Sequence, residues 1–424
     1  MRGIKELIEE AGRCVRCGAC KSVCPTYDVL RREQSGPRGR LSLVEASFKG
    51  ESGFGGAYLK NIKECTLCGS CHSNCPNGVN IPELILAARA EGVEKGGLSL
   101  AESFAYRGLL HSERFMQAAL RLASRLQGLF LKGTAFENGL VSRFSLPVIG
   151  GGRLLPELAD EFFLDRSHIE ELSPSATPVR GKKGGVLRVG FFAGCGVNYL
   201  LPDIGEATIR VLKESGAEVV VPQQVCCGMP AYSAGDRRTA RDLALKNLEA
   251  FEASGVDIIT TSCATCGHGL KKVFAELLSD EGLQMRSRVE RFASMVRDIT
   301  ELLTGELPYK GGEKGKKGGV VTYHDPCHLR RYQGISEEPR RLLSKSVFTF
   351  KGMKHPCRCC GLGGGVGFAN YELSMEIAKE KASSVRATGA DVVATACPGC
   401  MVQLKDALYQ SGVKARVAHV VELL

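Results

Sequence analysis

The sequence predicts a multidomain α+β protein, in which a helical, cysteine-rich amino-terminal region precedes two related α/β halves with parallel sheets. Three observations support this prediction. Eight cysteines crowd into the first 92 residues. Apolar runs and helical patterns alternate through the carboxyl-terminal part, as they do in α/β units. Five cysteines of the first half recur in the second at offsets of 132 to 134 residues, which indicates an internal repeat.

Cysteine content and linkers divide the chain into four expected parts: residues 1–92, 93–185, 186–306 and 318–424. The second part lacks cysteine and is expected to be a helical connector, because apolar residues recur at helical spacing from Leu109 to Phe130. We expect this stripe to pack on the protein itself or on a partner rather than on a membrane surface. A linker rich in glycine and lysine, at 307–319, separates the two α/β halves.

Each α/β half is predicted to present its cysteines at one edge of a parallel sheet. In the first half, Cys195 follows the first expected strand, Cys226 and Cys227 follow the second, and Cys263 follows the third. Cys266 then lies in the first turn of a helix. Open α/β sheets bind ligands at the carboxyl ends of their strands, where helix amino termini favour negative charge. The expected strands are 186–193, 218–221 and 257–261, with helices at 204–214 and 238–253; the second half opens with a strand at 320–323.

The amino-terminal cysteines form the most specific motif of the chain, C-x-x-C-x-x-C-x-x-x-C-P, which occurs twice. In two-cluster proteins with this run, the fourth cysteine of each run ligates the other cluster. We therefore expect two [4Fe–4S] cubanes, whereas zinc would be expected to pair two C-x-x-C units. The first quartet of ligands is Cys14, Cys17, Cys20 and Cys75, and the second quartet is Cys65, Cys68, Cys71 and Cys24.

The repeated five-cysteine sets also indicate metal binding, because soft thiolates at spaced positions are typical metal ligands. Five thiolates exceed the need of one cubane or one zinc ion, and an adjacent cysteine pair favours a thiolate that bridges two irons. A zinc site, or a cubane with one spare cysteine, remains an alternative. The first set is Cys195, Cys226, Cys227, Cys263 and Cys266, and the second set is Cys327, Cys359, Cys360, Cys397 and Cys400.

Bulk composition narrows the class of protein further. The formal net charge is +10, but thiolates bound to clusters would reduce it, and no compact basic run with interleaved aromatic residues suggests nucleic acid. A disulfide framework is not expected in a chain of this length with tight C-x-x-C groups and an amino terminus unlike a secretory signal. We expect a cytoplasmic protein without a membrane span, either free or held at the inner face of the membrane through partners.

A few further residues attract attention beside the expected ligands. His328 adjoins Cys327 and His268 follows Cys266, so each could donate a hydrogen bond to sulfur or move a proton near a cluster. Cys357 belongs to neither set, and its role stays open. The glycines of 361–367 fit neither a dinucleotide nor a phosphate loop, and are better explained by close backbone approach to a cluster.

The tandem C…CCG…C-x-x-C domains resemble the cysteine-rich family of heterodisulfide reductase catalytic subunits, whose members can hold a non-cubane [4Fe–4S] centre on five cysteines. Two ferredoxin-type runs followed by two such domains resemble the iron–sulfur subunit of glycolate oxidase and its D-lactate dehydrogenase relatives. The matching stretches include Cys24-Pro25-Thr26-Tyr27, Phe192-Ala193-Gly194-Cys195 and His324-Asp325-Pro326-Cys327-His328-Leu329. The resemblance covers nearly the whole chain and is weakest between residues 93 and 180.

This resemblance implies an electron-transfer subunit of an oxidoreductase. An FAD-containing partner would oxidise a 2-hydroxy acid such as glycolate or D-lactate, and electrons would pass through two cubanes to one or two further clusters in the cysteine-rich domains. No flavin is expected on this chain, and the acceptor could be an electron-transfer flavoprotein, a quinone or a membrane subunit. Because both five-cysteine sets are complete, a heterodisulfide-reductase-like role, with a disulfide reduced at a non-cubane cluster, is the alternative.

Overall fold

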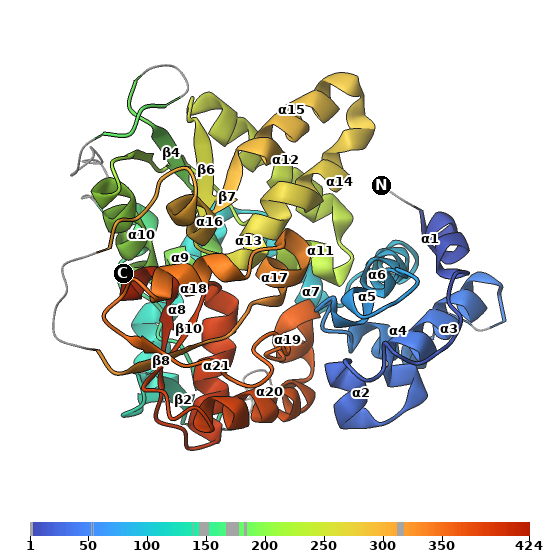
Figure 1. Cartoon of the computed structure of the whole chain (residues 1–424). Coiled ribbons are helices and arrows are strands. Elements are labelled where there is room, and N and C mark those ends of the chain that lie inside the picture. Colours follow the sequence, from blue (N-terminus) through green and yellow to red (C-terminus); the bar gives the residue numbers. More distant parts are fainter. Residues whose placement is uncertain are drawn as a thin grey trace.

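A computed structural model describes residues 3–51, 53, 55–137, 139–143, 152–166, 178–181, 185–311 and 318–424. The fold is mixed α and β, with a helical amino-terminal region and two α/β halves built on parallel sheets, as predicted (Figure 1). Part of the glycine- and lysine-rich linker, residues 312–317, lies outside the described residues. None of the described helices is long and apolar enough to cross a bilayer.

The amino-terminal region is a helical layer that wraps two cysteine-bearing loops. Its small core joins α6 to α1, α3 and α4 through buried side chains such as Leu41, Ile62 and Ile85. Asn80 begins α6 by accepting a hydrogen bond from the Glu83 N–H, and Pro82 follows in the first turn, where proline is tolerated. The helices are α1 (Ile4–Ala11), α2 (Pro25–Leu30), α3 (Pro37–Phe48), α4 (Gly56–Lys63), α5 (Ser70–Ser73) and α6 (Ile81–Gly96).

The two α/β halves share one topology. Each contains a four-stranded parallel sheet, with orders β5-β4-β6-β7 and β9-β8-β10-β11. Counted along each half, both orders read 2-1-3-4, so the strand order reverses between the first and third strands, where such sheets bind ligands. The strands are β4 (Arg188–Phe191), β5 (Glu218–Val220), β6 (Ile258–Thr261), β7 (Val296–Asp298), β8 (Val320–Tyr323), β9 (Thr349–Phe350), β10 (Val392–Thr395) and β11 (Arg416–His419).

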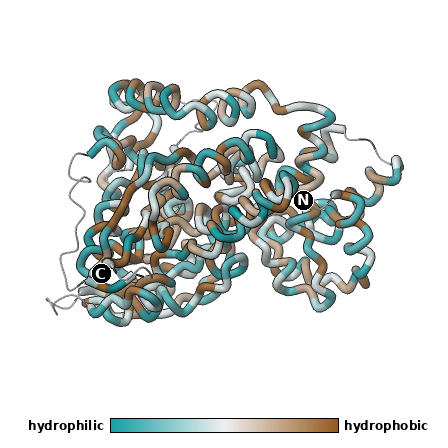
Figure 2. Tube along the Cα trace, turned by 90° about the horizontal axis from the view of Figure 1, so that it is seen from above, coloured by the Kyte–Doolittle hydropathy of each residue, from teal (hydrophilic) through white to brown (hydrophobic). Residues whose placement is uncertain are grey.

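Helices cover both sheets and seal one continuous core, which contains buried residues of both halves. Figure 2 shows hydrophobic segments gathered inside this lobe and hydrophilic segments along its outline. The helices of the first half are α9 (Gly194–Tyr199), α10 (Pro202–Glu214), α11 (Met229–Ala234), α12 (Arg237–Ala253), α13 (Ala264–His268), α14 (Phe274–Leu278), α15 (Leu283–Met295) and α16 (Ile299–Thr304). Those of the second half are α17 (Cys327–Gln333), α18 (Glu337–Leu343), α19 (Val366–Ala369), α20 (Tyr371–Arg386) and α21 (Pro398–Gln410).

In the described part of the expected helical connector, the α-helices end at Phe130. It forms α7 (Leu100–Ser103), a π-helical segment (Phe104–Leu110) and α8 (Glu113–Phe130), and then an antiparallel sheet of β1 (Leu131–Gly133), β2 (Leu140–Ser142) and β3 (Leu154–Leu155). A short 3₁₀ helix follows at Phe163–Asp165, and residues 144–151, 167–177 and 182–184 lie outside the described residues, so the helical connector as a whole stays a prediction. Contacts with the second half hold these short strands, since the Leu154 N–H donates to Asp406 (3.0 Å) and Glu137 accepts from the Val417 N–H.

Helix α8 packs on the protein along one face only. Met116 is buried against Phe162 and Tyr199, whereas Phe115, Leu122, Leu126 and Leu129 remain exposed on the opposite face. The apolar stripe thus has two parts. In the exposed part, Phe115 meets the ring of Phe104 edge-on (6.1 Å), while Leu122, Leu126 and Leu129 face outward.

Candidate metal centres

The two amino-terminal quartets each line a cavity of their own. Cys14, Cys17, Cys20 and Cys75 surround one cavity, with Arg38 at its edge. Cys24, Cys65, Cys68 and Cys71 surround the other, together with Arg40 and Thr66. In both cavities the fourth cysteine comes from the opposite run, which is the grouping that the motif predicts. The second quartet is the more buried, because Cys17 of the first quartet is exposed.

The loops that carry these quartets have matching backbone strain. Arg16 (φ 54°) and Leu67 (φ 52°) occupy the left-handed region, each directly before the second cysteine of its run. Such strain persists where surrounding contacts over-determine it. Here a side chain holds each strained carbonyl: Arg38 Nη1 donates to the Arg16 oxygen (2.9 Å), and Tyr332 Oη donates to the Leu67 oxygen (2.8 Å). The second contact comes from α17, so the second α/β half positions the second quartet.

The five cysteines of each set lie in the segments that follow three parallel strands. In the first half, β4 leads to Cys195, β5 to Cys226 and Cys227, and β6 to Cys263 and Cys266. Cys266 Sγ lies 3.4 Å from Cys227 Sγ, and the Cys266 N–H donates to Cys263 Sγ (3.5 Å). These sulfur atoms are too far apart for a disulfide, and all the described cysteines are free.

The second set repeats this arrangement after β8, β9 and β10. Cys360 Sγ lies 3.8 Å from Cys400 Sγ, the counterpart of the Cys227–Cys266 contact. The Gly361 N–H donates to Cys359 Sγ (3.4 Å). Gly361 has φ 103°, and a Cβ there would lie 2.4 Å from the Ser374 carbonyl oxygen, so only glycine fits after this cysteine pair.

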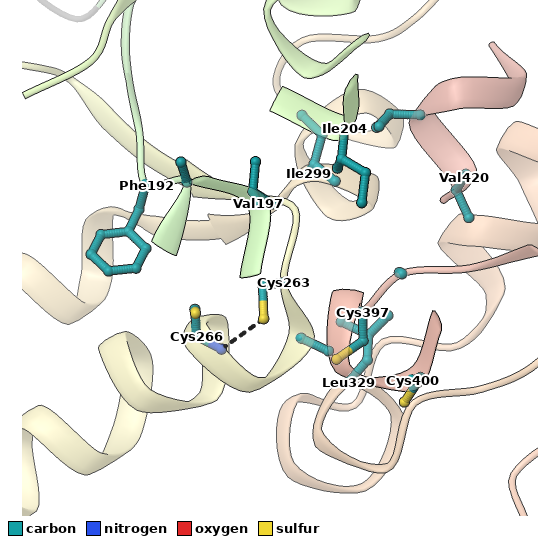
Figure 3. Close-up of a cluster of buried hydrophobic side chains, with 14 of the residues drawn as sticks. Phe192, Val197, Ile204, Cys263, Cys266, Ile299, Leu329, Cys397, Cys400 and Val420 are labelled. Carbon is teal, nitrogen blue, oxygen red and sulfur yellow. Dashed lines mark hydrogen bonds between the residues drawn. The ribbon is translucent and has the colours of Figure 1, made fainter. Parts of the chain in front are cut away.

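The two sets meet at the junction of the halves. Figure 3 shows Cys263 and Cys266 facing Cys397 and Cys400 across this junction. The Ala264 N–H donates to the Ala396 oxygen (3.1 Å), and Thr265 Oγ1 lies 3.6 Å from Cys397 Sγ. Hydrogen bonds that Cys397 accepts from Cys263 and then from Cys400 lower the pKa of Cys397 well below its usual range.

The second set also adjoins the second quartet. Cys68 of the second quartet makes a hydrogen bond to Cys359 of the second set. This bond, together with burial, raises the pKa of Cys68 well above its usual value. Arg331 Nη1 donates to the Cys68 carbonyl (3.3 Å). Gly364 approaches so closely that a Cβ would lie 2.3 Å from the Cys65 carbonyl oxygen. The glycine-rich segment therefore packs against a cysteine loop, in keeping with the expected close backbone approach.

The four cysteine groups consequently form one series of neighbours. The first quartet, at the exposed end, adjoins the second, because each quartet takes one cysteine from the run that supplies three cysteines to the other. Cys68 then leads to Cys359 of the second set, and Cys397 leads to Cys263 of the first set. In space the second set lies between the quartets and the first set, although it comes last in the chain.

The residues present fit iron–sulfur clusters, because each site gathers several cysteine sulfur atoms, which are the ligands that such clusters take. Most of these thiols have a raised pKa, but one cysteine of each adjacent pair has a lowered pKa. Hydrogen bonds from Cys226 and Cys266 lower the pKa of Cys227 to about 5. Equivalent bonds from Cys359 and Cys400 lower the pKa of Cys360 well below its usual value. Thiolates are the ligand form of cysteine, and a buried anion needs a compensating cation. The second cysteine of each adjacent pair, Cys227 or Cys360, is thus the one whose metal-binding thiolate form is favoured.

Three histidines, His268, His324 and His328, lie near the five-cysteine sets. His328 Nδ1 lies 3.0 Å from Thr265 Oγ1, and its ring stacks on that of His268 at 5.3 Å. Burial lowers the pKa of both histidines. Both lie at the junction of α13 and α17, and His328 is linked to Cys397 through Thr265. Their proposed role remains a prediction. His324 approaches cysteines directly, and the sequence reasoning, which favoured His328, underrated it.

The sequence does not identify Arg89, which the structure shows to be a structural residue at the junction of three parts of the chain. Its buried guanidinium donates to five backbone carbonyls, from Ile62, Lys63, Cys65, Ser233 and Gly364. These carbonyls belong to the amino-terminal region and to both α/β halves. Burial lowers the pKa of Arg89 to about 10. Its position inside an apolar helix pattern was the only available signal.

A further cavity lies beside the first set. Cys195 and Cys226 line it together with Glu113, Met116 and Tyr199, so α8 forms one of its walls. Burial raises the pKa of the Glu113 carboxyl. Cys357, the cysteine outside both sets, accepts a hydrogen bond from Arg331 at its carbonyl (2.7 Å) and keeps an undetermined role.

Two quartets in a helical region and paired five-cysteine sets on parallel sheets define an iron–sulfur protein. A family model for a 4Fe-4S dicluster domain matches residues 10–79, and one for a cysteine-rich domain matches 189–271 and again 321–405. The probable glycolate oxidase iron-sulfur subunit of Bacillus subtilis is 31% identical over 99% of this chain and 95% of that protein. The chain belongs to the family of iron–sulfur proteins that includes this subunit.

Two other relatives have different names. A subunit of the fumarate reductase (CoM/CoB) of Methanothermobacter marburgensis is 32% identical over 97% of this chain and 71% of that protein. A subunit of the dihydromethanophenazine:CoB–CoM heterodisulfide reductase of Methanosarcina acetivorans is 28% identical over 94% of this chain and 89% of that protein. The family therefore combines one domain layout with more than one named activity.

Proposed function

We propose that this chain is the iron–sulfur electron-transfer subunit of an FAD-linked oxidoreductase that acts on a 2-hydroxy acid, such as glycolate or D-lactate. The observation that carries the proposal is the series of four neighbouring cysteine groups. When bound, iron–sulfur clusters would supply one-electron transfer. The named Bacillus subtilis relative supports a glycolate-oxidising complex.

In this proposal the protein holds, spaces and insulates its clusters. The first quartet would hold one cubane near the surface, where a partner can approach the exposed Cys17, and the second quartet would hold another in a buried site. Backbone N–H groups such as those of Cys266 and Gly361, which already donate to sulfur, would stabilise negative charge on the ligands. One or two further clusters, of the non-cubane type, would occupy the five-cysteine sets.

The test is purification of the native complex without oxygen, through a tag on this chain. We expect an FAD-containing partner to co-purify, and we expect glycolate or D-lactate to bleach the visible iron–sulfur absorption of the complex. Iron should reach at least eight atoms per chain, the content of two [4Fe–4S] cubanes. A native complex without any flavoprotein would contradict the proposal.

A second candidate is disulfide reduction at the five-cysteine sets. The observation that favours it is the contact of the two complete sets at Cys263 and Cys397, which would place two clusters side by side. The cavity lined by Cys195 and Cys226 lies beside the first set, however, and not at this junction. Reduction of a heterodisulfide by the purified chain, with a reduced viologen as donor, would establish this candidate; inactivity against a broad panel of disulfides would exclude it.

A further inference from the structure

His324 is a buried side chain without a hydrogen-bond partner for its ring. It directly follows β8 and is 1% exposed, and neither ring nitrogen has a partner among the described residues. Its backbone is fixed, since its N–H donates to the Ala394 oxygen (2.9 Å) and its carbonyl accepts from Thr395 Oγ1 (3.1 Å). An unsatisfied buried polar group in a well-held position calls for an explanation such as an ion or a redox role.

The imidazole lies at the second set. One ring nitrogen of His324 and the sulfur atoms of Cys360 and Cys400 all lie within 4.8 Å of one another. Burial, followed by the charge of Lys381, lowers the pKa of His324 to about 3. Asp325, Cys397 and the backbone carbonyl of Pro356 act in the opposite direction, but this carbonyl does not meet the geometry of a hydrogen bond to the ring. A neutral imidazole offers one N–H and one lone pair, so it can donate a single hydrogen bond to a sulfur atom.

The first set has no such group at the corresponding position. Phe192 precedes Cys195 by three residues, as His324 precedes Cys327, and its buried ring packs on Phe251 at 5.8 Å. Figure 3 shows Phe192 on the first-half side of the junction, near Cys266. The two sets thus match in their cysteines and differ in this neighbour, aromatic and apolar in one and polar in the other.

We propose that His324 donates an N–H···S hydrogen bond to the iron–sulfur cluster of the second set and thereby raises the reduction potential of that cluster. A donor to sulfur stabilises the more negative reduced state, and hydrogen bonds to sulfur are among the features that set cluster potentials. The first set lacks this contribution because Phe192 has no donor. The inference rests on the proposed function only in requiring a cluster at the second set.

The contact itself can be observed by pulsed EPR of the reduced holoprotein carrying ¹⁵N-labelled histidine. We expect a ¹⁵N coupling and an exchangeable proton coupling at the second-set cluster. His324→Gln should remove the ¹⁵N coupling and keep an exchangeable proton, because glutamine retains an N–H donor. His328→Gln, which changes the other histidine flanking Cys327, should keep both couplings. Wild-type protein without any ¹⁵N coupling at this cluster would overturn the proposal.

The effect on potential is measured with His324→Phe, which installs the residue of the first half. At a fixed poise near the wild-type midpoint, we expect the reduced-to-oxidised ratio of the second-set cluster to fall roughly tenfold, about 59 mV for one electron. His324→Gln should recover much of this ratio. An unchanged ratio in His324→Phe at full iron content overturns the role of His324. If this variant loses its cluster, the EPR couplings of the labelled wild-type protein and of His324→Gln decide whether the hydrogen bond exists.

These outcomes separate the two proposals. A flavoprotein complex with an unchanged second-set cluster in His324→Phe leaves the electron-transfer function standing and removes the histidine contact. A histidine-coupled cluster in a chain that has no flavoprotein partner does the reverse. Wild-type protein that binds no iron at the second set overturns the histidine contact.

Discussion

Single side chains from elsewhere in the fold hold the cysteine loops in strained shapes. Tyr332 of α17 bonds the carbonyl of Leu67, just as Arg38 bonds that of Arg16. Tyr332→Phe removes one hydrogen bond, which is expected to lower the free energy of unfolding by about 1 kcal/mol. Because the freed loop carries the second quartet, iron should also be released faster from that quartet in air.

The matched control for this prediction is Tyr371→Phe. Tyr371 Oη bonds Asp406 (3.0 Å), whose carboxylate accepts from the Leu154 N–H, and not a cysteine-bearing loop, so this variant loses a comparable hydrogen bond. It should lower stability without accelerating iron release. Equal rates of iron release in the two variants, followed by absorbance at a fixed oxygen concentration, would contradict a specific role for Tyr332.

Asp298 makes stability depend on pH in an unusual direction. Burial raises its pKa from 3.8 to about 6, despite hydrogen bonds from Thr300. The folded state therefore binds a proton more tightly than the unfolded state, so its contribution to stability is present at low pH and is lost as pH rises through about 6. Between pH 5 and 7 the free energy of unfolding should fall by roughly 1 kcal/mol relative to Asp298→Asn. Anaerobic urea titrations across this range test it, and parallel pH profiles of the two proteins would refute it.

At the scale of secondary structure, α8 presents an apolar face bordered by Arg114 and Arg125. This arrangement fits a partner subunit with an apolar patch and an acidic rim, which agrees with a chain that works inside a complex. Leu122→Asp combined with Leu126→Asp should weaken association with the partner at least tenfold and leave iron content unchanged. Leu283→Asp, on the exposed start of α15, is the control.

Binding assays with the isolated partner provide the measurement. Undiminished association of the double variant would contradict the assignment of this face. Loss of binding to vesicles of anionic lipid, with association to the partner intact, would show instead that the face meets a membrane.

The elements that the sequence predicts well are those with a strong local pattern. The strands β4, β6 and β8 are buried apolar runs, and the helices α10 and α12 have helical periodicity, so each could be predicted within a few residues. The strands β1 to β3 have two or three residues each, too few for a local pattern. They depend on contacts between residues distant in sequence, from Leu154 to Asp406 and from Val417 to Glu137. The grouping of each quartet followed from motif chemistry. The contact of Cys263 with Cys397 and the orphan ring of His324 depend on tertiary packing, which no local pattern encodes.

At the scale of the whole molecule, Arg89 joins three parts of the chain through carbonyl groups alone. Arg89→Met would leave several buried carbonyl oxygens without a donor, and should lower the free energy of unfolding by at least about 3 kcal/mol. Limited proteolysis should then release the amino-terminal region before the α/β halves are cut. Arg288→Met, which removes a surface pair with Glu252, should cost less than about 1 kcal/mol.

Equal losses of stability in the two arginine variants would refute the view that Arg89 is a structural hub. Retention of iron at the two five-cysteine sets in Arg89→Met would show, in addition, that these sets form independently of the amino-terminal region.

The second cysteine set lies between the amino-terminal quartets and the first set, yet the half that carries it is synthesised after both. Domains of a growing chain fold largely in the order of synthesis. The amino-terminal region and the first half are therefore made before the cysteine set that lies between theirs, although α6 and α11 already join these two parts directly. A chain truncated before residue 318 would keep both amino-terminal quartets and the first set, and we expect little electron exchange between them, because the set that separates them would be absent.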